Sequence, residues 1–139
     1  MSAAVEGAVE GVPSIGFSLL NHDEDADFSH CHATIEKVIE GALKNGIDKN
    51  TCLNVNLPDK EIKGIKICRQ GNAFWKDNFE VRQDPMNGEY YWLKGIFTHL
   101  DKGEDTDIAA LEKGYASIVP VQFDMTAHHS IASLNNWEF

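Results

Sequence analysis

Apolar residues follow two spacings in the first 60 positions, one typical of helices and one typical of buried strands. Positions 1 to 10 hold small apolar residues at helical spacing, and Gly11 with Pro13 marks the end of that helix. The run from Pro13 to Leu20 is apolar and of strand length, so it predicts a buried strand. The acidic stretch Asn21 to Asp27 then lies at the carboxyl end of this strand, which is the functional edge of an open α/β sheet.

A second helix and a second strand follow. Ser29 is the predicted N-cap of the helix, and Asn45-Gly46 its predicted end. The apolar positions between them share one helical face: Cys31, Ile35, Val38, Ile39, Ala42 and Leu43. Cys52 to Leu57 predicts a strand closed by Pro58. Because helix and strand alternate, positions 1–60 are predicted to be part of an α/β domain with a parallel sheet.

The pattern changes after Pro58, where β-type residues such as Ile62, Ile65 and Ile67 begin a different region at 61–104. Positions 84–88 are rich in turn formers, which predicts a β-hairpin. The expected register sets Val81 opposite Tyr91 and Phe79 opposite Leu93 on an apolar face. The opposite face is predicted to carry Glu80, Arg82, Tyr90 and Trp92. A two-stranded ribbon is marginal alone in water, so it must pack on something.

The last region, 105–139, is predicted to contain a helix, a strand and a terminal helix. Asp105 and Thr106 are candidate caps of a helix that ends at Lys113. Tyr115 to Val121 is strand-like, and Pro120 restricts that part to a sheet edge or a strand end. Thr126 is the predicted cap of the terminal helix, which spans 126–139. Its apolar positions recur every three residues: Ile131, Leu134 and Trp137. No obvious partner for this helix exists in the sequence.

The composition excludes some functions. The net charge of −10, from 22 acidic and 12 basic residues, repels phosphate backbones and anionic membranes, so we expect no nucleic-acid polymer and no membrane as partner. No apolar run approaches the ~20 residues of a membrane span, and no signal-peptide pattern is present, so we expect a cytoplasmic protein. Cys31, Cys52 and Cys68 are an odd number without paired spacing, and we expect them to be reduced and buried.

One dense cluster of potential metal ligands occurs at positions 21–32: His22, Asp23, Glu24, Asp25, Asp27, His30, Cys31 and His32. An EF-hand is excluded, because Phe28 stands where the loop needs Gly and Thr34 where it needs Glu. His30 and His32 are two apart and do not form the i, i+4 pair of a helical zinc site. A solvated acidic loop is the favoured interpretation, and whether the loop binds an ion stays open.

Other residues also have a chemical and a structural interpretation. His128 and His129 diverge by about 100° on a helix, which favours surface residues over a shared ligand. Cys52 lies in an apolar run without a basic neighbour, which favours core packing over a nucleophile. The aromatic residues around the predicted hairpin could form a base-stacking platform, but an acidic chain favours a protein interface: Phe74, Trp75, Phe79, Tyr90, Tyr91 and Trp92.

Several short motifs in order resemble the C-terminal half of the SurE-type nucleotidases. They include Cys52-Leu53-Asn54-Val55-Asn56-Leu57-Pro58, Ile65-Lys66-Ile67-Cys68-Arg69-Gln70 and Tyr90-Tyr91-Trp92-Leu93-Lys94-Gly95. The resemblance extends upstream to Ala3-Ala4-Val5-Glu6-Gly7 and downstream to Gly114-Tyr115-Ala116-Ser117-Ile118-Val119-Pro120, so it covers almost all 139 residues. It implies the remaining part of a doubly wound, Rossmann-like parallel sheet with a projecting β-hairpin and a C-terminal helix.

The resemblance also implies a divalent-metal-dependent phosphohydrolase that acts on nucleoside 5′- and 3′-monophosphates with Mg²⁺ or Mn²⁺. The family's metal-binding Asp-Asp-Gly turn, later Ser and loop Asn precede this region, and the sequence contains no Asp-Asp pair. We therefore expect a fragment that is inactive alone and holds no catalytic, cofactor-binding or metal-binding residues of the family. Whether Met1 is a native start stays open.

The resemblance further implies assembly with copies of the same chain. In this family the hairpin at 74–95 and the terminal helix at 126–139 mediate dimers and tetramers, so we expect a homodimer or homotetramer. A nucleoside monophosphate is expected as substrate only of the intact protein. The alternative hypothesis is a non-catalytic oligomerisation or binding module.

Overall fold

Four strands form the main sheet in the order β1-β2-β6-β3. They are β1 (Ser14–Leu19), β2 (Thr51–Leu57), β6 (Ala116–Gln122) and β3 (Ile65–Ile67). This computed structural model describes residues 1–138, and Phe139, the last residue of the predicted terminal helix, lies outside the described residues. The α/β class is thereby confirmed, with both predicted strands of the first 60 residues in place.

The sheet is mixed rather than wholly parallel. β1 pairs with β2 in parallel, β2 pairs with β6 antiparallel, and β3 pairs with β6 in parallel. The chain reverses in positions 58–64, because β3 already runs in the opposite direction to β2. The hairpin and a helix then connect β3 to β6, which runs parallel to it. β3 falls within positions 61–104, yet it belongs to this sheet and not to the hairpin.

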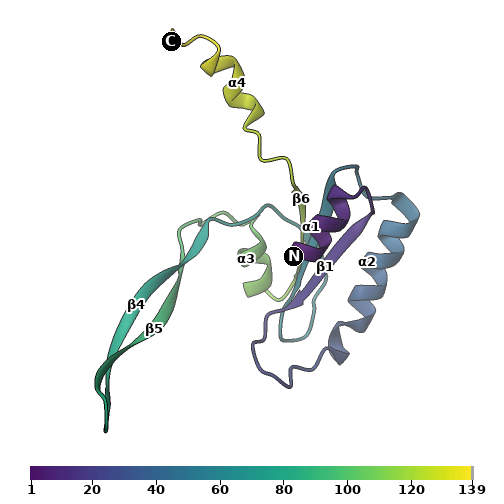
Figure 1. Cartoon of the computed structure of the whole chain (residues 1–139). Helices are drawn as coiled ribbons and strands as arrows, with labels where there is room; N and C mark the ends of the chain where they lie inside the picture. The colour runs from purple at the N-terminus through teal and green to yellow at the C-terminus, as the bar shows by residue number, and fades with distance from the viewer. Residues whose placement is uncertain (139) are drawn as a thin grey trace.

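Two helices cover opposite faces of the sheet (Figure 1). On α1 (Ser2–Val9), Ala4 and Ala8 pack against Cys52. On α2 (His32–Asn45), Val38 packs on the other face, in the main core with these sheet residues: Leu19, Val55, Leu57, Ala116 and Ile118. Gly46 ends α2 with a φ of 78°, as its predicted C-cap requires. α3 (Asp107–Glu112) covers β6 on the α1 side, where Ala110 contacts Val119.

The predicted hairpin is a long ribbon that projects from the sheet (Figure 1). Its strands are β4 (Ala73–Asp84) and β5 (Gly88–His99), and they pair antiparallel along their whole length. The register sets Phe79 opposite Leu93 and Val81 opposite Tyr91, so the predicted apolar face is confirmed. On the other face the guanidinium of Arg82 lies 4.8 Å from the ring centre of Trp92.

The terminal helix is α4 (His128–Leu134), which is shorter than the predicted 126–139, because residues 135–138 are not helical. It extends away from the sheet and has no buried residue (Figure 1). Its predicted cap, Thr126, is wrong: the N-cap is Ala127 without a side-chain bond, and Asp124 Oδ1 accepts the Thr126 N–H at 2.9 Å. None of the described helices is long and apolar enough to cross a membrane.

Two more local predictions need correction. Ser29 does not cap α2, because a 3₁₀ turn at Ser29–Cys31 precedes that helix and Asp27 accepts bonds from the Ser29 N–H and hydroxyl at 2.8 and 2.6 Å. Leu43 is 83% exposed, although its spacing predicted the buried face. Thr106, in contrast, caps α3 as predicted, since its Oγ1 accepts the Ala109 N–H at 3.2 Å.

Candidate functional site

A row of polar side chains crosses the sheet on the face that α1 and α3 cover, near the carboxyl ends of β1 and β2. We call Ser18, Asn54, Asn56 and Ser117 the polar row. Ser18 pairs with Asn56 in the parallel ladder and Asn56 with Ser117 in the antiparallel one, so the three side chains share one face. Asn54 lies two residues before Asn56 and therefore faces the same way.

The polar row is only partly satisfied within the described residues. Ser18 Oγ donates to Asn56 Oδ1 at 2.6 Å. Ser117 is fully buried, and its hydroxyl has no hydrogen-bond partner among residues 1–138. A hollow of about 250 Å³ opens over Gly16, Ser18 and both asparagines, beside Met1 at the start of α1.

Sheets covered on both faces are normally apolar there, and a buried polar group without a partner costs about 1–3 kcal/mol. The polar row also lies at the carboxyl edge, where open α/β sheets bind their ligands. It is therefore the candidate functional site of this chain. The sequence interpretation missed it, although asparagine at alternate positions 54 and 56 of an otherwise apolar strand was an available signal.

Next to the polar row, β1 forms one edge of the sheet. Among the described residues its only strand partner is β2, so the backbone groups on its other side meet no strand. The strand is not a typical solvent edge, because Ile15 and Phe17 pack into the main core below it. An apolar strand with an open backbone edge is a surface on which a further strand can pair.

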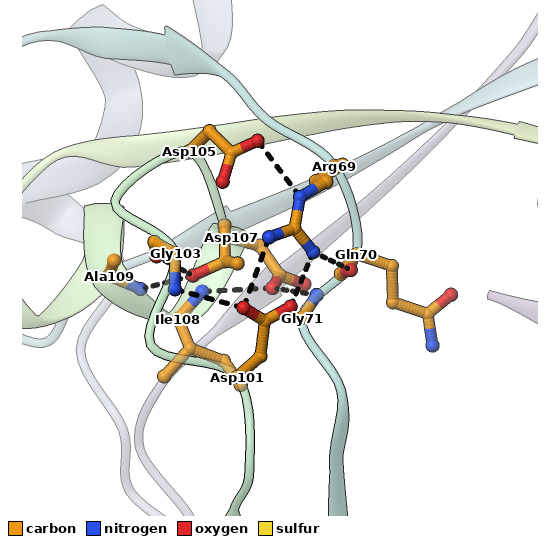
Figure 2. A network of polar contacts seen from close by, with 10 residues as sticks. Arg69, Gln70, Gly71, Asp101, Gly103, Asp105, Asp107, Ile108 and Ala109 are labelled. Carbon is orange, nitrogen blue, oxygen red and sulfur yellow. Dashed lines mark hydrogen bonds and ion pairs between the residues drawn. The ribbon is translucent and has the colours of Figure 1, made fainter.

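A second polar cluster joins the base of the ribbon to the sheet and α3 (Figure 2). Arg69 Nε donates to Asp105 Oδ2 at 2.8 Å. Both terminal nitrogens of Arg69 donate to the Asp101 carboxylate, and the distance from Nη2 to Oδ1 is 3.0 Å. Asp101 Oδ1 also accepts the Gly103 N–H at 2.9 Å. We call Arg69, Asp101 and Asp105 the ribbon clamp, since Arg69 lies just before β4 and Asp101 just after β5.

Neighbouring backbone bonds extend the clamp. The Arg69 N–H donates to the Asp105 carbonyl at 3.1 Å, and the Asp107 N–H to the Arg69 carbonyl at 3.0 Å. Asp107 Oδ1 accepts the Gly71 and Ile108 N–H groups at 2.8 and 2.9 Å (Figure 2). Asp101 and Asp105 share the one guanidinium of Arg69, and Asp107 is held by two backbone N–H groups, so these side chains orient the ribbon.

Replacing Arg69 with Ala is expected to loosen the ribbon at its base. Amide hydrogen exchange should accelerate severalfold at Leu100, whose N–H bonds to the Asn72 carbonyl at 3.0 Å, and should be unchanged at the tip. Arg82→Ala is the matched control, because Arg82 is also ion-paired, with Glu80, but lies near the tip. Equal effects of both variants at Leu100 would contradict the clamp.

Acid is expected to open the same clamp. Hydrogen bonds from the Arg69 guanidinium lower the pKa of both Asp101 and Asp105. In Asp101 a hydrogen bond from the Gly103 N–H lowers the pKa further. A carboxyl whose pKa is lower in the folded protein stabilises the fold above its unfolded pKa of about 3.9, and this contribution is lost as the pH falls below that value. The protection factor of the Leu100 amide, which accounts for the pH dependence of intrinsic exchange, should therefore fall below about pH 4 in the parent chain and change less in the Arg69→Ala variant.

The acidic and histidine loop at 21–32 does not form a metal centre in the structure. The Asp27 carboxylate accepts a hydrogen bond from the Ser29 hydroxyl, and His30 Nε2 lies 3.1 Å from the Pro58 carbonyl oxygen. Asn21 accepts the Asp23 N–H and donates to Asp59 at 3.0 Å. Within residues 1–138 no three His, Cys, Asp or Glu side chains come close enough to hold one ion. The polar row has only uncharged hydroxyl and amide groups, and two of them are hydrogen-bonded to each other. The described residues therefore do not supply the carboxylate ligands that a divalent metal prefers.

The remaining candidates have structural roles. Cys31, Cys52 and Cys68 are free and buried, as predicted, and burial raises the pKa of Cys31 and of Cys68, which makes both thiols poor nucleophiles. His128 Nε2 lies 3.0 Å from Asp124 Oδ2 at the start of α4. His129 is the adjacent residue on the same helix and exposed, so the two histidines do not share a ligand.

An open α/β sheet with a polar carboxyl edge defines the class of doubly wound proteins that bind ligands at that edge. Comparison with known proteins gives the family. The profile of the family described as Survival protein SurE matches residues 1–77. The chain belongs to the SurE family.

Relatives match nearly the whole chain. It is 53% identical to the 5′-nucleotidase SurE of Flavobacterium psychrophilum and to that of Christiangramia forsetii, over 99% of this chain and 55% and 54% of those proteins. The crystal structure of SurE protein from Aquifex aeolicus superposes with a TM-score of 0.78 at 33% identity, over 96% of this chain and 55% of that one. The chain thus spans about half the length of the curated relatives it matches.

Proposed function

We propose that this chain is the C-terminal half of a divalent-metal-dependent nucleoside 5′/3′-monophosphate phosphohydrolase that works in the cytoplasm. The observation that carries the proposal is the open edge of β1 beside the polar row. A strand supplied by the other half would pair with β1 and bring its carboxyl end next to Ser18. The names of the curated relatives, 5′-nucleotidase SurE, support the substrate class.

In this proposal the chain's own residues position groups and do not react. Ser18 and Asn56 are hydrogen-bonded to each other. The buried Ser117 hydroxyl next to them has no hydrogen-bond partner among residues 1–138. These neutral donors and acceptors would orient the loop or substrate that docks beyond β1. Mg²⁺ or Mn²⁺ belongs to the proposal through the family resemblance, and its ligands would come from the other half.

The ribbon and α4 are proposed to assemble copies of the chain into a homodimer or homotetramer. The support is the apolar surface that both elements expose, including Trp92 on the ribbon and Ile131 and Leu134 on α4. A non-catalytic assembly or binding module is the second candidate function, and the same exposed surface favours it. The two candidates differ in whether the polar row takes part in a composite site.

Mixing this chain with the N-terminal remainder of the F. psychrophilum relative tests the proposal. We expect a one-to-one complex by sedimentation, and binding of Mn²⁺ to the complex by calorimetry that this chain alone does not show. A variant of the chain with Ile15→Pro is the control, because proline in β1 disrupts the strand that must pair. Failure of the two parts to associate, or a complex that takes up no Mn²⁺, would favour the non-catalytic module.

A further inference from the structure

An apolar hollow of about 410 Å³ lies beyond the polar row, between the carboxyl edge of the sheet and the base of the ribbon. Leu20 follows β1, Pro58 follows β2, Phe97 belongs to β5, and Ile108 and Leu111 belong to α3. The hollow therefore lies on the side of the sheet that α3 covers, the side that carries the polar row. Its volume is within the range of small-molecule sites.

The hollow begins just past the strand ends that carry the polar row. Leu20 and Pro58 come two positions after Ser18 and Asn56, immediately beyond the last residues of β1 and β2. The parallel ladder continues to Leu20, whose N–H donates to the Leu57 carbonyl at 2.8 Å. On both strands, apolar lining thus follows the polar row within two residues of the chain.

The charges at the rim disfavour an anion in the hollow. Asp59 and Glu112 carry two negative charges there, and the one cation, Lys60, donates its Nζ to the Glu112 backbone carbonyl at 3.0 Å. A phosphate would meet repulsion at this place. A flat, uncharged ring with N–H groups at its edge would instead meet apolar walls and carboxylate acceptors.

Phe97 is held in place as one wall. Its ring lies 5.5 Å from the ring of Trp75, centre to centre, at a tilt of 60°, which is a favourable aromatic geometry. Trp75 lies against Gly95, where a Cβ would come within 2.7 Å of the indole. Phe97 remains 49% exposed, so part of its ring is free to contact a ligand.

We propose that the hollow binds the base of a nucleoside monophosphate, with the sugar phosphate directed toward the polar row. The substrate class rests on the proposed function, but the hollow itself is built entirely from this chain. Stacking on Phe97 and contact with Leu20 and Leu111 would bind any base. The carboxylates of Asp59 and Glu112 would favour bases that carry an amino group.

Adenosine is the probe, because it has the base and no phosphate. In the 139-residue chain with isotope-labelled Leu and Ile methyl groups, millimolar adenosine is expected to shift the signals of Leu20, Ile108 and Leu111, whereas ribose is not. Phe97→Ala should weaken adenosine binding about tenfold, since base stacking on an aromatic ring is lost. Phe28→Ala is the matched control, because Phe28 is an exposed phenylalanine outside both the hollow and the ribbon and should leave binding unchanged.

Three outcomes would overturn the base site: no shift of these methyl groups with adenosine, equal weakening by both phenylalanine variants, or shifts that follow dilution of the chain and not adenosine. The last result would mean that a second copy of the chain fills the hollow. The test is separate from the proposed function, because adenosine binding needs neither the other half nor a metal. Mn²⁺ binding by the mixed complex without adenosine binding would refute the base site alone.

Discussion

The 139-residue chain alone is expected to release no phosphate from AMP with Mg²⁺ or Mn²⁺, whereas its complex with the N-terminal remainder of the F. psychrophilum relative should hydrolyse AMP. The difference should exceed about a thousandfold, because enzymes accelerate such reactions by many orders of magnitude. The reason lies in the donor set. The polar row offers hydroxyl and amide groups, and within residues 1–138 no carboxylates converge on it.

Release of inorganic phosphate is the measurement, with each part alone and the mixture compared at equal concentration. Asn56→Leu in the mixture should lower kcat about a hundredfold, because the Ser18 hydroxyl loses its acceptor and the docked groups lose their alignment. Asn78→Leu on the exposed ribbon is the matched control and should have no effect. Metal-stimulated turnover by the chain alone that survives re-purification would contradict this account.

Trp92→Ala is expected to dissociate the oligomer of the chain, weakening association by roughly 3 kcal/mol, or about a hundredfold in Kd. The ribbon exposes an apolar surface on which the proposed assembly rests, and both of its faces contribute: Phe74, Trp75, Phe79, Val81, Tyr91, Trp92, Leu93 and Ile96. Trp92 is 52% exposed in the single chain and lies near the middle of one face. Aromatic residues in that position typically dominate an interface.

Truncation after Met125 is expected to have a similar effect and to lower solubility. α4 has no buried residue, and Ile131 and Leu134 are exposed on it. Sedimentation equilibrium measures both changes. Leu43→Ala provides the control, since Leu43 is exposed on α2. That helix lies on the opposite side of the sheet from the ribbon (Figure 1). A parent chain that sediments as a monomer at micromolar concentration, with tryptophan emission typical of buried rings, would contradict the assembly.

The local sequence pattern predicted those features of the fold that depend on residues close together in the sequence. The turn at 84–88 set the ribbon register, and Thr106 capped α3, since both depend on a few adjacent residues. Pro120 also behaves as expected. β3 pairs only with residues 116–118 of β6, so Pro120 lies beyond β3 and needs no N–H on that side.

The errors involve long-range structure. The direction of β3 and β6 depends on how the chain reverses after β2, which no local spacing encodes. Ser29 had the right chemistry for a cap, but Asp27 bonds to it and an extra 3₁₀ turn displaces the start of α2. The polar row is assembled from three strands, and only the alternation of Asn54 and Asn56 marks it in the sequence. The resemblance to SurE proteins gave the family, which the comparisons confirm.

The central claim is that the open edge of β1 receives a strand from the other half of the protein. Amide hydrogen exchange of Ser14–Leu19, measured in the chain alone and in the complex with the N-terminal remainder of the F. psychrophilum relative, tests it most directly. The account predicts that the β1 amides facing away from β2 exchange fast in the chain alone and become protected in the complex. Protection that instead appears on the ribbon or α4, with the β1 amides still exchanging fast, would contradict it.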